Sequence, residues 1–290
     1  MKRLQHFEKY GGKIRFLALH NLAHRLLVPV FKLYIAGEKK KLVIVDDRRK
    51  KTNKPKIFCP THIGGMDVEM SIIAIKDPCI FLLGDPRELY RSFDGLVLQL
   101  NGVIPIDVAI KEDRIAAKAT MADVLRKGGN LLLFPEGVQN ISPNALVGKL
   151  FPGAVELAIT CGADIVPIAI HKDNDTYYII LGENISYENC KVEDKMRLTT
   201  ELRDHIATLK WEIIEKLPMI RHSEATEKMY QDMIDEIFNM STEYTWTIED
   251  IKKGMFIEKG VTSPKEAFSF MDNLFPNKEN AFLFDKRLLG

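Results

Sequence analysis

The chain has 290 residues, of which 46% are hydrophobic and 28% charged, a balance typical of a folded protein with a sizeable core. These proportions exclude collagen-like, repeat and disordered polypeptides. The net charge is only +1, but residues 1–56 carry 16 basic against four acidic side chains, a net of +12, and the remainder carries 25 against 36, a net of −11. This asymmetry favours contact with an anionic surface, either lipid or nucleic acid; a solvated basic face is the alternative.

The first long apolar stretch covers residues 14–36 and is interrupted by His20, His24, Arg25, Pro29 and Lys32. A membrane-spanning helix needs about 20 consecutive, mostly apolar residues, so this stretch is not expected to span. It fits an amphipathic helix that lies in a membrane interface, with packing against a soluble core as the alternative. The side chains expected to insert are Phe16, Leu19, Leu22, Leu26 and Leu27.

Short apolar strands then alternate with helices along the chain. The expected strands are 41–45, 57–59, 79–84, 102–107, 130–134, 164–170 and 176–181. The expected helices are 67–75, then 111–127 with Ile115, Ala119 and Ala122 on one face, and 153–161, closed by Gly162. This alternation predicts an α/β fold with a mixed, mostly parallel sheet covered by helices on both faces.

From residue 191 onward the sequence is polar and helical in pattern, with helices expected over 191–217 and 222–240. We therefore divide the chain into three regions. They are a basic, amphipathic membrane-docking region at 1–56, a core at 57–185 and a helical C-terminal extension at 186–290.

The four cysteines are far apart and form no CxxC pair, so small core residues in a reducing compartment are expected rather than disulfides. Cys59 precedes His62 by three residues, which leaves a thiol role conceivable, but nothing else in the sequence supports a Cys-His nucleophile. Cys59, His62 and Asp67 lack a fourth ligand at zinc-site spacing, so no metal site is predicted.

Four short motifs lie at the ends of expected strands, where an open α/β sheet binds its ligands. In chain order they are HIGGMD at 62–67, GVIPID at 102–107, FPEG at 134–137 and VPI at 166–168. Each alone is weak, since FPEG by itself is compatible with a plain type II turn. Their combination in this order, each on the matching element, is far more specific.

This set resembles the glycerolipid acyltransferase family typified by 1-acylglycerol-3-phosphate acyltransferases, whose motifs read NHxSxxD, GxIxIDR, FPEGTRS and VPI. The resemblance runs over roughly residues 41–182. It implies transfer of an acyl group from a thioester to a hydroxyl, with His62 as general base and Asp67 as the residue that orients it. Gly64 and Gly65 would let the main chain turn tightly enough for the two side chains to meet.

The resemblance also implies an acceptor site around the third motif. Glu136 and Gly137 match that motif, and a carboxylate there can hold acceptor hydroxyls or fix a loop. A glutamate facing water in a turn is the alternative. The substrate-binding residues expected on this basis are Glu136, Gly137, Gly102, Gln139 and Lys149.

Two departures from the family pattern concern phosphate recognition. The second motif ends in Val108 and the third reads FPEGVQ, so Val108 and Gln139 stand where the family has arginine. Guanidinium binds phosphate through a charged, two-pronged contact that neither residue reproduces. Three explanations stay open: other cations such as Lys111, Arg114 or Lys149, an acceptor without a free phosphate beside its hydroxyl, or lost activity.

The partners expected from the resemblance are a lysophospholipid-like acceptor, an anionic membrane surface and an acyl donor, either acyl-CoA or acyl-carrier protein, with no other cofactor. The expected location is cytoplasmic and peripheral, on the inner face of the membrane. Alternative functions are acyl transfer to an amine or glycolipid, thioester hydrolysis, and non-catalytic lipid binding. Nucleic-acid binding is disfavoured because aromatic residues are not interleaved through the basic cluster at 38–56.

Overall fold

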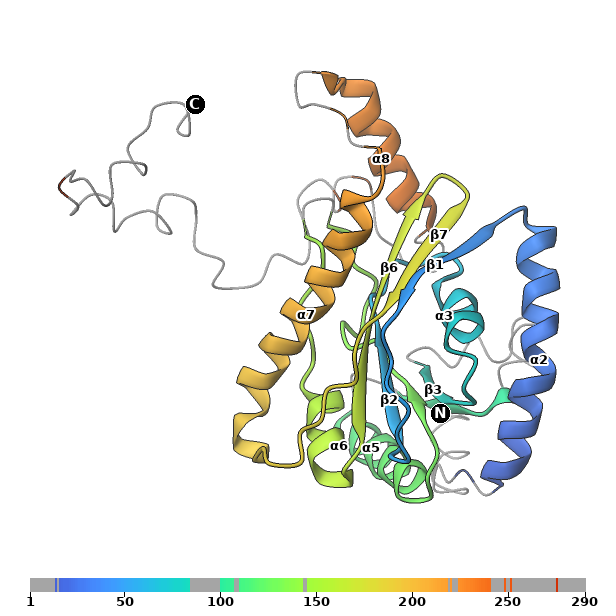
Figure 1. The fold of residues 1–290 in the computed structure, drawn as a ribbon, viewed down its shortest axis with the longest axis vertical. Helices are drawn as coiled ribbons and strands as arrows, with labels where there is room; N and C mark the ends of the chain where they lie inside the picture. Colours follow the sequence, from blue (N-terminus) through green and yellow to red (C-terminus); the bar gives the residue numbers. More distant parts are fainter. Residues whose placement is uncertain are drawn as a thin grey trace. The chain divides into compact units, whose positions relative to one another are not determined.

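A seven-stranded mixed sheet is the centre of the computed structural model (Figure 1). The residues described are 14, 16–83, 100–106, 110–142, 145–218, 220 and 224–240, together with positions 248, 251 and 275. The strands are β1 (Lys41–Asp47), β2 (Lys56–Pro60), β3 (Ile80–Leu83), β4 (Val103–Pro105), β5 (Leu131–Leu132), β6 (Asp164–Asp173) and β7 (Thr176–Leu181). The principal helices are α2 (Leu17–Gly37), α3 (Asp67–Ile75), α5 (Lys111–Arg126), α6 (Gly153–Cys161), α7 (Lys195–Glu215) and α8 (Glu227–Met240).

The strand order is β1-β7-β6-β2-β5-β3-β4. From β6 to β4 all neighbouring strands are parallel, whereas β7 is antiparallel to β6 and pairs in parallel with β1. The predicted fold class, a mixed and mostly parallel sheet covered by helices, is therefore confirmed. The central strands could be recognised because strands buried on both faces are continuously apolar, as in the DIVPIAI run of β6.

Helices cover both faces of the sheet, and β2 shows how the faces are divided (Figure 1). Phe58 belongs to the apolar cluster that contains α2 and α3 residues, whereas Ile57 and Cys59 belong to the cluster of α5, α6 and α7. Successive side chains of a strand point to opposite faces, so the two layers follow from the sequence alternation. Cys59 is fully buried on the α5–α7 side, and burial raises the pKa of its thiol, which removes it as a partner for His62.

The predicted inward face of α5 is wrong. Ala122 is buried, but Ile115 is 59% exposed and Ala119 is exposed. The helix instead packs through Ala117, Thr120, Met121, Val124 and Leu125. The prediction placed Ile115 on the packed face, whereas the buried side chains lie on a different side of the helix.

The division of the chain into three domains stays a prediction. Elements from all three predicted regions pack against one another in the structure. β1 lies before residue 56 and pairs with β7, and Lys56 itself is the first residue of β2. α7 lies after residue 186 and contributes Leu198, Leu202 and Ile206 to the same core cluster as α5 and α6. Both flanking regions thus supply parts of the sheet or its cover.

Part of the basic charge near the N-terminus is compensated within the chain. Arg48 forms an ion pair with Glu212 of α7, Lys50 with Glu183, and Lys54 with Glu188. Lys40 lies 2.5 Å from Asp175. The contrast between a basic N-terminal segment and an acidic remainder is therefore in part an internal complementarity, which weakens it as an argument for an external anionic surface.

Candidate active site

The HIGGMD segment forms a turn between the carboxyl end of β2 and the start of α3. Gly64 and Gly65 have φ of +82° and +61°, a region that L side chains seldom adopt. Space forbids a side chain as well, because a Cβ on Gly64 would lie 2.4 Å from the amide of Gln139 and one on Gly65 would lie 2.7 Å from the hydroxyl of Tyr177. The predicted need for glycine at both positions is confirmed.

The turn brings His62 and Asp67 together as predicted, with His62 Nδ1 2.9 Å from Asp67 Oδ2. The same carboxylate oxygen accepts the main-chain N–H groups of Ile63 and Gly64, each at 2.8 Å. Asp67 is 1% exposed and is the first residue of α3, where the helix dipole favours negative charge. A carboxylate only accepts, so Nδ1 carries the proton and Nε2 is left as the basic nitrogen of a neutral ring.

The His62 ring is partly accessible. Its side chain is 23% exposed, and its face lies against Phe134, with the ring centroids 4.6 Å apart. An imidazole held by a buried carboxylate on one nitrogen and partly exposed to solvent is an arrangement that suits general-base catalysis.

Five successive N–H groups of the turn, from His62 to Met66, all have partners. His62 N donates to Glu136 Oε1 at 2.8 Å, and Asp67 accepts the next two, as described above. Gly65 N donates to the carbonyl of Met240 in α8 at 3.2 Å, and Met66 N to the Tyr177 hydroxyl at 3.2 Å. Such complete pairing fixes the main chain that carries the histidine.

Glu136 is a structural clamp in this arrangement. Its second oxygen accepts the N–H of Gly148 at 2.6 Å, so both oxygens hold main-chain donors. The residue is 3% exposed, and burial raises the pKa of its carboxyl against the lowering effect of these N–H groups and of Lys210. Of the two roles expected for Glu136, holding acceptor hydroxyls or fixing a loop, these contacts match the second, because they join the turn to the 145–150 loop.

Gln139 also points inward. Its Nε2 donates to the carbonyl of Ile63 at 2.9 Å, and the residue is 2% exposed. The next residue, Asn140, donates its N–H to the carbonyl of His62 at 2.8 Å. Gln139, which stands at the family's arginine position, therefore hydrogen-bonds to the main chain of the turn and points into the protein interior.

The remaining predicted substrate residues are dispersed. Gly137 is exposed in the turn after β5, with φ of +69°, and Lys149 is exposed next to Gly148. Gly102 lies at the amino end of β4 beside Ile80 and His20, at the edge of the sheet opposite to His62. Val108 lies outside the described residues, so its expected role is untested.

Two other cations considered for phosphate binding follow strand β4, which is not a neighbour of β2 in the sheet. Lys111 and Arg114 stand at the start of α5, which follows β4. Three strand spacings, roughly 14 Å, separate β4 from β2 in the sheet.

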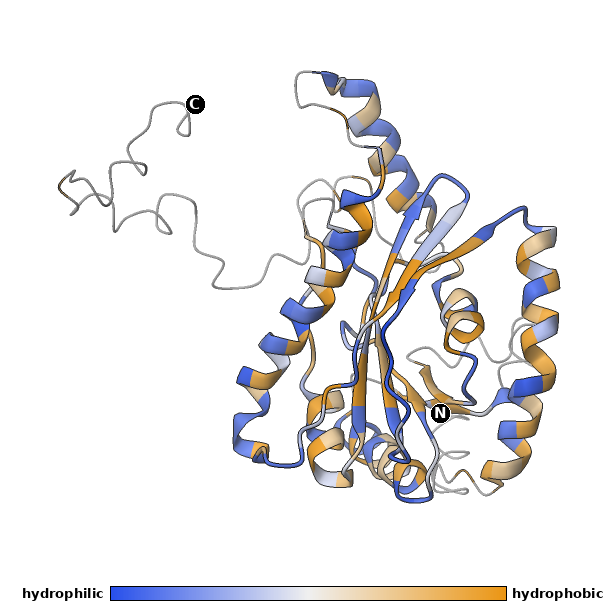
Figure 2. Ribbon diagram, in the orientation of Figure 1, coloured by the Kyte–Doolittle hydropathy of each residue, from blue (hydrophilic) through white to orange (hydrophobic). Residues whose placement is uncertain are grey.

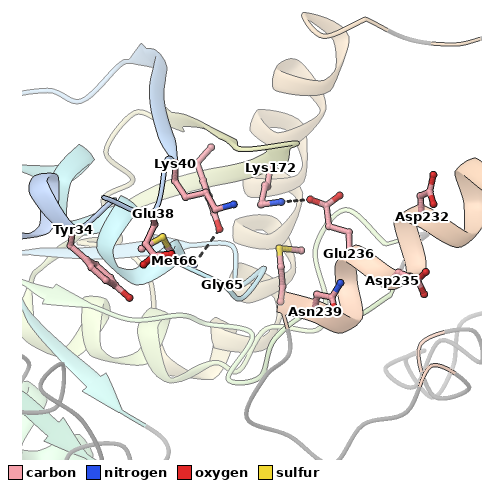
Figure 3. Close-up of a pocket in the computed structure, with 12 residues that line it drawn as sticks. Tyr34, Glu38, Lys40, Gly65, Met66, Lys172, Asp232, Asp235, Glu236 and Asn239 are labelled. Carbon is pink, nitrogen blue, oxygen red and sulfur yellow. Dashed lines mark hydrogen bonds and ion pairs between the residues drawn. The ribbon is translucent and has the colours of Figure 1, made fainter. Parts of the chain in front are cut away.

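A cavity of about 490 Å³ borders the turn on the side of Gly65 and Met66 (Figure 3). It lies between the end of α2, the β6–β7 hairpin and α8, and His62 is not among its lining residues. In Figure 3, Lys172 of β6 and Glu236 of α8 point toward one another across it and form an ion pair. This pair attaches α8 to β6, and the bond from Gly65 to Met240 attaches it to the HIGGMD turn.

Sequence reasoning missed three members of this site: Lys210, Tyr177 and Met240. Lys210 was detectable in principle, because it occupies an inward position of α7 next to Leu209 and between Ile206 and Ile213. Tyr177 and Met240 act through tertiary contacts that no local pattern indicates.

Comparison with known proteins agrees with this geometry. A family model described as Acyltransferase matches residues 41–171. A 1-acyl-sn-glycerol-3-phosphate acyltransferase of Borreliella burgdorferi is 27% identical over 187 residues, which cover 60% of this chain and 72% of that protein. The crystal structure of the 1-acyl-sn-glycerophosphate acyltransferase PlsC of Thermotoga maritima shares the fold, with a TM-score of 0.56 at 13% identity over 68% of this chain and 81% of that one. Motif order, fold and these matches together support the resemblance of the chain to the glycerolipid acyltransferase family.

Proposed function

We propose that this acyltransferase moves a fatty acyl group from a thioester, acyl-CoA or acyl-carrier protein, to a hydroxyl of a lysophospholipid-like acceptor. The observation that supports this most directly is the contact of the partly exposed His62 ring with the buried Asp67 carboxylate. The Borreliella and Thermotoga proteins are both named as acyltransferases of 1-acyl-sn-glycerophosphate lipids, which is the same reaction class.

The reaction follows from this pair. His62 Nε2 accepts the proton of the acceptor hydroxyl while its oxygen attacks the thioester carbonyl carbon. Asp67 stabilises the imidazolium that forms, as the aspartate of a Ser-His-Asp triad does in hydrolases. The tetrahedral intermediate collapses, the carbon–sulfur bond breaks, and the departing thiolate takes the proton from His62. The products are an ester and a free thiol.

Gln139 favours one class of acceptor over the parent substrate of the family. Its amide donates a hydrogen bond to the carbonyl of Ile63, so the side chain at position 139 does not bind a phosphate. An acceptor without a free phosphate next to the reacting hydroxyl fits this position better, such as a lysophospholipid with a capped headgroup, a glycolipid or an amine-bearing lipid.

A membrane surface is the proposed meeting place of enzyme and acceptor. On α2 and the residue before it, the apolar side chains Phe16, Leu19, Leu22, Leu26, Val30 and Leu33 are all exposed and follow helical spacing. Leu27, expected among them, instead packs against the core. None of the helices in the described ranges combines the length and apolar character needed to cross a bilayer. Such a stripe fits insertion into an interface.

The test of the reaction is thiol release from acyl-CoA and acyl-carrier protein, with product mass, for the wild type and His62→Ala. The panel contains lysophosphatidate, capped lysophospholipids, a glycolipid, amine lipids and no acceptor. Release that requires both one acceptor and His62 supports a transferase and identifies its substrate. Full activity of a folded His62→Ala variant contradicts the assignment, and release without acceptor points to hydrolysis.

A further inference from the structure

The cavity beside the HIGGMD turn takes no part in the reaction steps described above. The end of α2, the turn itself, the β6–β7 hairpin and α8 enclose it (Figure 3). Six of the residues that line it are charged, four of them acidic and two basic. A cavity of this composition is built for a polar ligand, and the balance of its charges indicates which kind.

The two cations of the lining are already compensated. Lys172 is paired with Glu236, and Lys40 lies 2.5 Å from Asp175, which is outside the lining. Three acidic residues of the lining have no ion-pair partner in the part of the chain that the structure describes, and these are Glu38, Asp232 and Asp235. The cavity therefore has an excess of negative charge that a bound cation would balance.

A second feature of the lining calls for an oxygen atom of a ligand. Tyr177 is 1% exposed, and its hydroxyl lies at Gly65 and Met66, which line the cavity too. The hydroxyl accepts the N–H of Met66 at 3.2 Å, but its own proton has no acceptor among the described residues. Because a buried hydroxyl normally donates as well as accepts, an acceptor atom in the cavity would complete the hydrogen bonding of Tyr177.

An organic ammonium group suits this lining better than a metal ion. Within the described ranges, no three His, Cys, Asp or Glu side chains are grouped closely enough to hold a metal. Asp235 already accepts the amide of Gln231 through Oδ1 at 2.8 Å, which leaves its Oδ2 for a donor. The aromatic ring of Tyr34 and the thioethers of Met66 and Met240 add polarisable surface of the kind that alkylammonium groups favour.

The cavity lies within reach of the histidine and of the proposed membrane surface. Three steps of the chain separate His62 from Gly65, so their Cα atoms are at most roughly 11 Å apart. A headgroup several bonds away from the reacting hydroxyl can cover this distance. Tyr34 and Glu38, at the carboxyl end of α2, belong to the lining, so the cavity lies where the exposed apolar stripe of that helix ends.

We propose that this cavity is a subsite for the headgroup of the acceptor lipid and that it selects a headgroup ending in an ammonium group. Glu38, Asp232 and Asp235 balance the charge of the ammonium, and an oxygen of the headgroup accepts the hydroxyl proton of Tyr177. The inference rests on the proposed function and deepens it, because it chooses the amine-bearing acceptor among those that Gln139 leaves open. Binding of the headgroup does not itself require turnover.

The experiment compares two acceptors with the same acyl chain, lysophosphatidylethanolamine and lysophosphatidylglycerol, in mixed micelles. The double variant Asp232→Asn, Asp235→Asn removes two carboxylates of α8, and Glu38→Gln removes the one on α2. The control is Glu227→Gln, because Glu227 is an exposed carboxylate of α8 that does not line the cavity. Turnover is measured by thiol release, and binding of each lipid without a donor is measured calorimetrically on wild type and His62→Ala.

The wild type and Glu227→Gln are expected to favour the ethanolamine lipid in kcat/KM by on the order of tenfold. The double variant should lose most of this preference through a KM for the ethanolamine lipid that rises about fivefold, and Glu38→Gln should lose about half of it. Their kcat should stay near that of the wild type, since the cavity touches no reacting atom. Binding to His62→Ala should show the same order of the two lipids.

Equal efficiency of the wild type with both lipids, or an unchanged preference in the double variant, would overturn the subsite. Inhibition by free phosphoethanolamine without any discrimination between the two lipids would overturn it as well, because the cavity would then hold a soluble amine. Carboxylate-dependent binding of the ethanolamine lipid by a wild type that transfers no acyl group would contradict the proposed function while supporting the cavity as an ammonium site.

Discussion

α2 and α7 are both 21 residues long, yet they use their apolar stripes in opposite ways. α7 turns its stripe to the sheet and buries seven residues, one of them Lys210. α2 buries only His24, Phe31 and Ile35, and its larger apolar stripe is exposed. Figure 2 shows that hydrophobic residues nevertheless recur along the whole helix. Amphipathic pattern alone does not distinguish these two uses.

The difference separates two tasks of the helical cover. α7 packs on β6 and β7, so its stripe contributes to the stability of the fold. The outward stripe of α2 contributes little to the fold and is available to a lipid surface. Substitutions in the two helices should therefore affect different measurements.

The largest expected effect is on stability and separates the helices directly. Ile213 of α7 is fully buried, whereas Leu26 of α2 is 66% exposed. Ile213→Ala should lower the free energy of unfolding by about 2–5 kcal/mol through lost burial and a cavity. Leu26→Ala should change it by less than about 0.5 kcal/mol. Urea unfolding of both variants measures this, and equal losses would show that α2 is packed as tightly as α7.

The second effect concerns lipid binding. Burying a leucine in an apolar phase stabilises by about 1.5–3 kcal/mol, so Leu26→Ser should weaken partition onto anionic phosphatidylglycerol vesicles by about tenfold or more. The control is Ile115→Ser, an equally exposed apolar residue on α5, at the other face of the sheet. Co-sedimentation measures both. A similar loss for Ile115→Ser, or none for Leu26→Ser, would contradict docking through α2.

The local parts of the site could be predicted from sequence, and the tertiary parts could not. The turn that joins His62 to Asp67 spans only six residues and includes Gly64 and Gly65, so a local sequence motif is enough to predict it. Gln139 was misread because its direction depends on the turn it packs beneath, 76 positions earlier in the chain. The same limit applies to α5. The sequence pattern placed Ile115 on the packed face, but in the structure this side chain is exposed and other residues of α5 pack against the core.

Most of the strands could be predicted from the sequence, because buried parallel strands are continuous apolar runs bounded by polar or turn residues. The role of α7 was less accessible. Its stripe predicts a packed helix, but nothing local to residue 210 indicates why a lysine stands among the buried apolar residues there. A charged residue at an inward position of a helix nevertheless indicates that an opposite charge or a polar partner lies nearby in the fold, because an uncompensated buried charge is costly.

The smallest expected effect is a pH dependence of stability on the α7 side. Burial lowers the pKa of His171 from 6.5 to about 4, so the unfolded chain binds a proton that the folded chain refuses. The stability that His171 contributes is present above pH 6.5 and is lost as pH falls toward 4. Between these values the wild type should lose about 1–2 kcal/mol more than His171→Gln, after allowance for partial exposure.

Urea midpoints measured from neutral to acidic pH test this, with His205→Gln as the control because His205 is an exposed histidine on α7 itself. Parallel pH curves for the wild type and His171→Gln would mean that the ring is hydrated and that Lys210 lies in a less apolar region than its burial indicates. A steeper acid loss in Lys210→Met than in the wild type would also contradict this electrostatic account, since removing the neighbouring cation should let His171 accept its proton more readily.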